Sequence, residues 1–254
     1  MRFLAGLLLI LASLKTHAAT ISIIIDDVGD NRHLALRSLN LDKRVALSIL
    51  PHTPFSQEIA HLALDQGNDI LLHQPMESYR DNHLLGPGPL LKSMDKDQIT
   101  KTLTKNLDAI PGVIGINNHM GSRLTEDPQK MAWVMSVLTR QNKFFIDSKT
   151  SARSVASKLA NEWQVPNVSR HIFLDHSDNP KAIEIQFKRL IKHAEKYGHA
   201  VAIGHPKVNT LAYLEQVLPG LAKNGIELIP ITETLVKSQI ANKSKQPTNV
   251  LTSY

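Results

Sequence analysis

Short hydrophobic runs alternate with segments of helical periodicity along most of this chain. The runs are rich in Ile, Val and Leu, which is typical of strands that are buried on both faces of a sheet. They lie near residues 20–25, 45–50, 69–73, 113–118, 143–147, 168–174, 199–204 and 226–230. Apolar residues recur with helical spacing in the segments between them, at residues 55–66, 95–110, 128–141, 152–163, 180–197 and 210–223.

This alternation is the pattern of βα units around a parallel sheet. Eight runs predict an α/β protein whose strands form a TIM-like (β/α) barrel, which need not be regular. We find no linker that would divide the chain, so we predict a single domain over residues 20–238. The polar segment 239–254 is predicted to be a disordered tail.

Polar side chains follow five of the predicted strands. The first run ends in two adjacent carboxylates, and later runs end at His73, at Asn118 and His119, at Asp147 and at His205. The carboxyl ends of parallel strands open on one face of such a fold, so we expect these side chains to converge. The alternative for Asp26 and Asp27 is that they end a strand and cap the next helix.

Two long connections follow strands of this kind, at residues 74–93 and 118–127. Connections of this length are often functional, and both begin where a predicted strand ends in polar residues. We expect them to lie over the same face and to shape a binding site there.

The first residues have the pattern of a secretory signal peptide. Arg2 precedes an apolar stretch from Phe3 to Leu14, and small residues follow as far as Ala18. The stretch is too short to span a bilayer, so we predict a signal peptide over residues 1–18 and no membrane span. Its removal leaves 236 of the 254 residues (254 − 18), a length that suits one barrel. The mature chain is expected to be periplasmic or secreted.

Composition restricts the chemistry further. The chain has 0 Cys, so a bound metal ion would have nitrogen and oxygen ligands. The net charge of +6 falls to about +4 (6 − 2) once Arg2 and Lys15 of the signal peptide are removed. Basic residues do not cluster with aromatic residues, so no nucleic-acid surface is predicted.

The order of these strand-end residues resembles that of the divergent polysaccharide deacetylases, a branch of the carbohydrate esterase family 4 superfamily. The resemblance extends from Ile21 to about Val236. It implies that Asp26 is a general base and that Asp27 binds a divalent metal ion, with zinc as our first choice. It also implies a second ligand at His73.

The third metal ligand has two candidates. In the superfamily a second His stands four residues after the first, and Glu77 occupies that place here. A carboxylate can replace imidazole on zinc, but His119 at the end of the fourth strand competes. We favour Asp27, His73 and His119, with Glu77 as a replacement ligand or as a partner that orients a ligand. A lone His is nevertheless more often a hydrogen-bonded structural residue.

The resemblance also implies roles for residues of the later motifs. It makes His205 the general acid and Asp147 the residue that tunes it, although both could be structural caps. The superfamily's Arg and Pro-Tyr motif is missing, and Arg123 stands in its place, where it either orients Asp26 or forms a surface ion pair. Ser122 is not expected to be a nucleophile, because no Gly-x-Ser-x-Gly turn surrounds it.

The activity implied by the resemblance is metal-dependent hydrolysis of N-acetyl or O-acetyl groups on a cell-wall or related glycan, such as peptidoglycan or chitin, without an organic cofactor. The departures at Glu77 and in the third motif leave an alternative. That alternative is a catalytically weak barrel that binds glycan or a cell-wall enzyme. Phosphoester hydrolysis is disfavoured, because the sequence shows no Gly-rich phosphate loop and no Arg cluster.

Overall fold

The computed structural model describes residues 18–245, and within them the strands form one parallel sheet. The strands lie in the order β6-β5-β4-β3-β2-β1-β8-β7, and β9 pairs with the start of β1. Their bounds are β1 (Ala19–Val28), β2 (Ala46–Ile49), β3 (Ile70–Met76), β4 (Gly115–Met120), β5 (Phe144–Asp147), β6 (Asn167–Ser169), β7 (Ile172–Phe173), β8 (His199–Gly204) and β9 (Ile226–Leu228). The predicted signal peptide lies outside the described residues except for Ala18.

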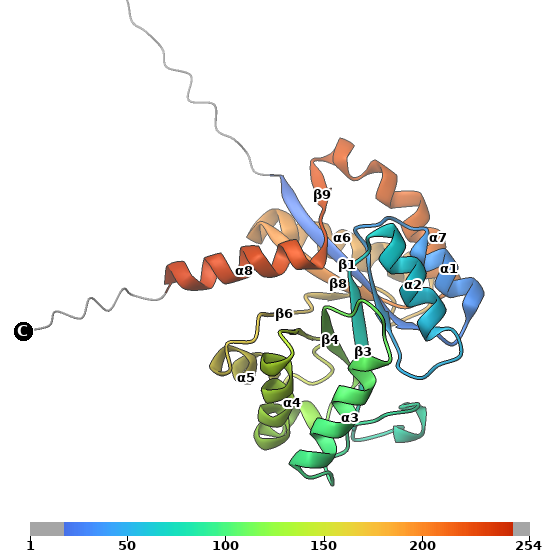
Figure 1. The fold of residues 1–254 in the computed structure, drawn as a ribbon. Helices are drawn as coiled ribbons and strands as arrows, with labels where there is room; N and C mark the ends of the chain where they lie inside the picture. The colour runs from blue at the N-terminus through green and yellow to red at the C-terminus, as the bar shows by residue number, and fades with distance from the viewer. Residues whose placement is uncertain (1–17, 246–254) are drawn as a thin grey trace, which may run out of the picture.

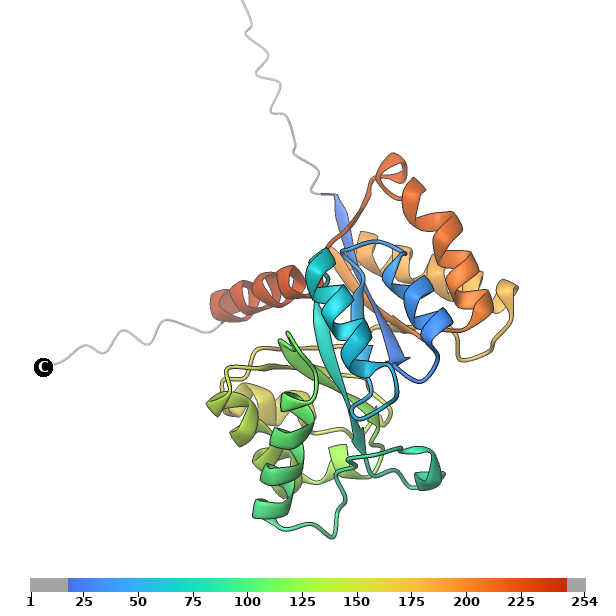
Figure 2. The ribbon, with the colours of Figure 1, turned by 45° about the vertical axis from the view of Figure 1, so that its right-hand side comes forward.

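Helices surround the sheet, as Figures 1 and 2 show. They are α1 (Arg32–Leu39), α2 (Ser56–Gln66), α3 (Lys96–Asp108), α4 (Pro128–Arg140), α5 (Ala156–Glu162), α6 (Pro180–Tyr197), α7 (Val208–Val217) and α8 (Ile231–Lys245). The segments of helical periodicity did not include α1 or α8. Between residues 18 and 245, no helix is both long enough and apolar enough to cross a membrane.

The two edges of the sheet are joined by residues 167–173. β6 pairs with β5, whereas β7 pairs with β8 at the opposite edge, and only Arg170 and His171 lie between β6 and β7. One short stretch of chain therefore borders both edges, and the predicted strand 168–174 is split between two partners. The α/β barrel class is confirmed, in a distorted form.

The strands are apolar on both faces because they separate two packed layers. Ile21, Ile23 and Ile25 of β1 belong to the larger core cluster, which includes residues of the surrounding helices. Ile24 points to the other side and packs in a smaller cluster, together with Ala46, Leu71, Ile146, Val201 and Ile203 from other strands. The period of two along a strand assigns alternate residues to the two layers.

Helix α8 covers the smaller cluster at the end where β1 begins. Ile231 and Leu235 pack within that cluster. The Thr234 hydroxyl lies 2.7 Å from the Ser22 hydroxyl near the start of β1. The rest of α8 extends away from the barrel (Figure 1) and continues to Lys245. Helix α8 thus includes residues 239–245 of the segment predicted to be a disordered tail, and residues 246–254 lie outside the described part.

Two further elements, β3 and α7, end at other residues than the sequence predicted. β3 continues to Met76, because Leu90 folds back and pairs with it, so the long connection begins at Glu77. α7 ends at Val217 and is followed by short 3₁₀ turns, since Pro219 cannot continue the hydrogen bonds of an α-helix.

We predict that Ile231→Ala lowers the free energy of unfolding by about 2–5 kcal/mol, because it opens a cavity under the barrel. Val236→Ala is the matched control on the same helix, since Val236 is 55% exposed whereas Ile231 is 0% exposed. Urea unfolding should place the control within about 0.5 kcal/mol of the unmodified protein. Equal effects of the two substitutions would contradict the packing of α8 against the barrel.

His171 joins the two edges of the sheet as a neutral imidazole. Its Nδ1 accepts the backbone N–H of Val201 at 2.9 Å, and its ring centroid lies 4.6 Å from that of His193 and 5.6 Å from that of His199. Burial lowers the pKa of His171, and the charges of His193, His199 and Arg170 lower it further, to about 4. The ordinary value is about 6.5, so the unfolded chain takes up this proton first.

The contribution of His171 to stability should therefore be complete above about pH 6.5 and should be lost as the pH falls toward about 4. His171→Gln retains an acceptor for the Val201 N–H but has no group that titrates. We expect the difference in urea midpoint between about pH 7.5 and about pH 5 to be smaller in this variant. The urea midpoint of the variant at the higher pH shows how much stability the substitution costs through lost packing. A difference between the two pH values as large as that of the unmodified protein would contradict the prediction.

Candidate metal centre

Three side chains converge above the carboxyl ends of β1, β3 and β4. Asp27 Oδ1 lies 2.9 Å from His119 Nδ1 and 3.1 Å from His73 Nε2, and the two imidazole nitrogens are 3.1 Å apart. The register of β3 and β4, which pairs His73 with Asn117, holds both imidazoles on the same side of the sheet. Within the described residues, this is the one group of His and acidic side chains whose ligand atoms are close enough to share a metal ion.

The donors of this group suit a divalent cation. Asp27 Oδ1 is buried against the two imidazole nitrogens, so a cation held between these three atoms would neutralise the carboxylate. His73 Nδ1 donates to Asn117 Oδ1 at 2.7 Å, so the lone pair of Nε2 faces Asp27 and His119. Two imidazole nitrogens and one carboxylate oxygen form an ordinary set of protein ligands for zinc.

Asn117 orients two members of the site at once. Its Oδ1 accepts both the His73 ring N–H and the Ser48 hydroxyl, the latter at 2.5 Å. Its Nδ2 donates to Asp26 Oδ1 at 2.7 Å. No role was predicted for Asn117, although it stands two residues before His119 and therefore faces the same side of β4.

Burial and charge act in opposite directions on the ionisable groups. Burial raises the pKa of Asp26, although His73, His205 and Asn117 oppose this. Burial also favours a higher pKa for Asp27, but the adjoining His119 and His73 outweigh it and hold the pKa well below its usual range. Burial lowers the pKa of His73, and the two carboxylates outweigh burial and raise it to about 9. The centre is therefore a place of concentrated negative charge.

His205 lies on the other side of the two carboxylates. Its Nδ1 donates to Asp175 Oδ1 at 2.8 Å, and its backbone N–H donates to Asp175 Oδ2 at 2.7 Å. Its Nε2 is directed toward the site, 3.7 Å from Asp27 Oδ2. Burial lowers the pKa of His205, but the hydrogen bond to Asp175 and the nearby charges outweigh it and raise the pKa.

The predicted pairing of Asp147 with His205 is wrong. Asp147 accepts the Ser154 hydroxyl at 2.8 Å and forms an ion pair with Lys149. It ends β5, which is far from β8 in the sheet order, whereas Asp175 follows β7, the neighbour of β8. The sequence contained this signal, because Asp175 directly follows the predicted strand 168–174.

Glu77 and Arg123 bind each other and lie outside the metal group. Their side chains form an ion pair of 2.7 Å, and the second carboxylate oxygen of Glu77 accepts the backbone N–H of Lys92. These contacts fasten the loop after β3. They do not support Glu77 as the third ligand or Arg123 as the residue that orients Asp26, since the hydrogen bond of Asp26 comes from Asn117.

The backbone turns sharply where several of these strands end. Asp27, Met120 and Lys149 have φ angles of 54°, 53° and 51°, in the left-handed region that residues other than glycine rarely adopt. Strain of this kind is concentrated at functional sites. In this structure the three residues lie at or just after the carboxyl ends of β1, β4 and β5, which border the site.

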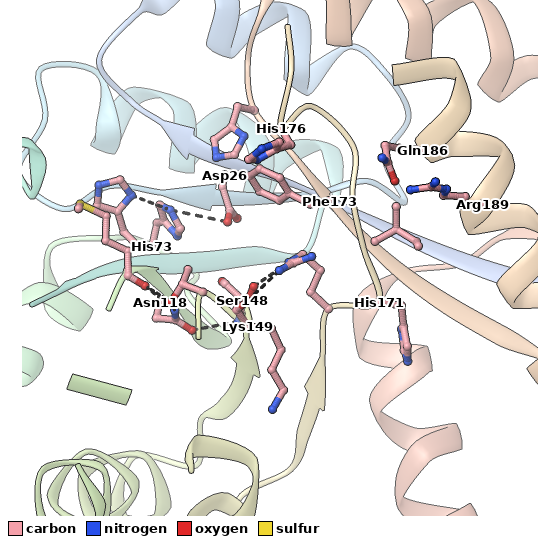
Figure 3. Close-up of a pocket in the computed structure, with 16 residues that line it drawn as sticks. Asp26, His73, Asn118, Ser148, Lys149, His171, Phe173, His176, Gln186 and Arg189 are labelled. Atoms are coloured by element: carbon pink, nitrogen blue, oxygen red, sulfur yellow. Dashed lines mark hydrogen bonds and ion pairs between the residues drawn. The ribbon is translucent and has the colours of Figure 1, made fainter. Parts of the chain in front are cut away.

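A cavity of about 710 Å³ extends from this centre across the mouth of the barrel. Asp26, His73, His119 and His205 line one part of it, and Lys149, Arg170, Phe173 and Arg189 line another (Figure 3). A volume of this size suits a small molecule or part of a polymer such as a sugar unit.

Comparison with known proteins gives relatives in sequence and in fold. The family model described as divergent polysaccharide deacetylase matches residues 23–235. An uncharacterized protein of Haemophilus influenzae is 37% identical over 209 residues, which are 82% of this chain and 74% of that protein.

Two solved structures share the fold. The uncharacterized protein ATU2773 from Agrobacterium tumefaciens has a TM-score of 0.82 at 19% identity, over 87% of this chain and 90% of that one. BA3943, a CE4 family pseudoenzyme from Bacillus anthracis, has a TM-score of 0.52 at 16% identity, over 85% of this chain and 65% of that one. At these identities the two structures show that the fold is shared. The family is shown by the family model, which matches residues 23–235. The chain belongs to the divergent polysaccharide deacetylase family.

Proposed function

We propose that this chain is an exported, metal-dependent deacetylase that hydrolyses acetyl groups of a cell-wall or related glycan. The observation that carries the proposal is the convergence of Asp27, His73 and His119, beside a cavity that both imidazoles line together with Asp26 and His205. Such a set contains a cation site, a base and an acid, as metal-assisted hydrolysis requires. Membership of the deacetylase family supports acetylated glycans as the substrate class.

Asp27, His73 and His119 would hold the cation, and zinc suits two imidazoles and one carboxylate. When bound, the cation supplies a Lewis acid that polarises the acyl carbonyl and makes water more acidic. The contribution of this chain is to orient the ligands. Asn117 fixes the His73 ring through its hydrogen bond to Nδ1.

Asp26 is placed to take a proton from the attacking water. It is 2% exposed and is held by the Asn117 amide, so the carboxylate has one orientation. Because its pKa is raised by burial, it is a stronger base than an exposed carboxylate.

His205 is placed to donate a proton to the leaving nitrogen. Its Nδ1–H is bound by Asp175, so only Nε2 is directed toward the substrate. As the water oxygen bonds to the acyl carbon, the bond from that carbon to nitrogen breaks and the amine takes the proton from His205. The products are acetate and a free amino sugar. With an O-acetyl substrate, the same proton goes to the leaving hydroxyl oxygen.

Export is supported by the N-terminal sequence pattern, with Arg2 before an apolar stretch and Ala18 at its end. N-terminal sequencing of the protein from the periplasm or medium tests it. A chain that still begins at Met1 and stays in the cytoplasm would exclude export.

The alternative is an accessory protein that binds a glycan or a cell-wall enzyme without catalysis. It is favoured by the existence of a pseudoenzyme on a similar fold. The two functions are separated by whether acetate is released from acetylated peptidoglycan or chitin fragments.

We predict that Asp27→Ala, His73→Ala and His119→Ala each deplete bound metal in the purified protein. Asn117→Ala should weaken metal affinity roughly 10–100-fold, as loss of a partner that orients a ligand usually does. Glu77→Gln is the control and should retain its metal, since Glu77 binds Arg123 instead. Metal content by mass spectrometry decides this. Loss of metal from Glu77→Gln with retention in His119→Ala would refute the ligand set.

For catalysis, Asp26→Asn and His205→Ala should each lower turnover by roughly 10²–10⁴-fold, the usual loss when acid or base assistance is removed. Asp175→Asn should also lower turnover, because it releases the His205 ring. Asp147→Asn is the matched control, since Asp147 is not the carboxylate that binds His205. Acetate release should be measured with metal content checked in each variant. A similar loss in Asp147→Asn and Asp175→Asn would contradict the assignment of Asp175.

A further inference from the structure

The cavity beyond the metal centre contains an excess of positive charge. Of the side chains that line it, all within the described part of the chain, Asp26 alone carries a carboxylate. Lys149, Arg170 and Arg189 line it as well. The charge of Lys149 is offset by Asp147, whose Oδ2 is 3.3 Å from its Nζ. The two arginines therefore need a separate explanation.

Arg170 is a half-buried cation that binds only uncharged groups. Its Nε donates to the Ser148 carbonyl at 2.6 Å and its Nη2 donates to the Lys149 carbonyl at 3.0 Å. No carboxylate lies within 4.0 Å of its guanidinium among residues 18–245. Burial lowers the pKa of Arg170, but a guanidinium stays charged in proteins. The charges of Asp26 and Asp147 favour this cation from beyond ion-pair range, and the fold retains it without an ion pair at the substrate cavity.

Arg189 adds a second cation from another element. It lies on α6, three residues after Gln186, so both are on the same face of the helix. Both line the cavity, and Figure 3 shows them together on the side of α6. Within the part of the chain that the structure describes, Arg189 also has no carboxylate in ion-pair range. Arg170 and Arg189 are distant in the sequence, and only the fold brings them to one cavity.

Phe173 connects these cations to the proposed reaction centre. Its ring centroid lies 5.2 Å from that of His205, and the Arg170 guanidinium lies over the same ring at 5.1 Å. In the view of Figure 3, Phe173 stands between Asp26 and the pair on α6. A sugar that packs on Phe173 with its acetyl group at Asp26 and His205 would have its other substituents beside Arg170.

We propose that the arginines form an anion subsite that binds a carboxylate of the glycan substrate. The substrate class is then an acetylated sugar with a carboxylate on the same ring or on the adjoining sugar. Arg170 binds the carboxylate through its free Nη1, and Arg189 attracts it from the rim. This assignment rests on the proposed deacetylase function, since it names the substrate of that site.

The test compares neutral and charged glycans on the full mature protein loaded with zinc. The neutral probe is a tetramer of N-acetylglucosamine. N-Acetylmuramic acid carries the carboxylate on the acetylated ring itself and is compared with N-acetylglucosamine, and a hyaluronan tetrasaccharide carries it only on the sugar that adjoins the acetylated one. Binding is measured by calorimetry with Asp26→Asn, in which turnover is slow, and acetate release is measured with Asp26 intact.

We expect at least one charged probe to bind more tightly than the neutral one. Arg170→Gln should weaken that binding by about tenfold or more, because a charge-assisted hydrogen bond in a half-buried site is lost. Arg189→Gln should weaken it by about two- to fivefold, since Arg189 is exposed. Neither substitution should change binding of the neutral probe. Arg140→Gln is the control, because Arg140 is exposed on α4 and does not line the cavity.

Each outcome decides a separate point. The charged probe that binds best identifies whether the carboxylate belongs to the same ring or the adjoining sugar. Equal binding of charged and neutral probes, or no binding of the charged ones, overturns the anion subsite. Charged probes that bind through Arg170 and Arg189 but release no acetate leave the subsite standing and remove the deacetylase function. Because Arg170 also holds two backbone carbonyls, Arg189→Gln provides the test if Arg170→Gln does not fold.

Discussion

The parallel pairing of the strands is the constraint on which the site depends. Each strand contributes side chains at its carboxyl end, and parallel pairing puts all these ends at the same rim. Asp27 on β1, His73 on β3 and His119 on β4 belong to segments far apart in the sequence, yet their ligand atoms lie about 3 Å from each other. Helix α8 covers the opposite end of the barrel. Its apolar residues Ile231 and Leu235 pack in the smaller core cluster and complete that layer.

Within that frame, the Asn117 side chain sets the geometry of the reactive groups. Its amide group both accepts and donates, and different partners use the two atoms: Ser48 and His73 donate to its oxygen, and Asp26 accepts from its nitrogen. A carboxylate could not donate to Asp26, and an apolar residue would leave His73 without a fixed tautomer. The amide therefore orients the imidazole of a candidate metal ligand and a buried carboxylate with a single rotamer.

Charge is distributed unevenly along the cavity. The end with the candidate metal ligands contains Asp26 and Asp27, whereas the other end is lined by the cations Arg170 and Arg189. His205 lies between the two regions, with Asp175 on one ring nitrogen and Phe173 against its ring. A substrate that spans the cavity would place unlike substituents at its two ends, which gives one physical basis for orientation and specificity.

The sequence by itself determined the class of fold and most of the metal centre. The continuous apolar runs and the polar residues that end five of them are local features, and they identified the strands and the candidates Asp26, Asp27, His73, His119 and His205. Glu77 was kept as a candidate only because of its spacing from His73. The structure gives it Arg123 as a partner, since a four-residue spacing says nothing about direction once β3 has ended at Met76.

Only the tertiary structure decided which strand end lies beside which. Asp147 and Asp175 both follow predicted strands, and the choice between them as partner of His205 depends on sheet order, which places β7 beside β8 and β5 far away. Arg170 reaches the cavity because the strand at 167–173 changes partner between β5 and β8 at that residue. Such neighbour relations arise from how the sheet closes on itself, and closure depends on the packing of the whole chain, which no local pattern of residues contains.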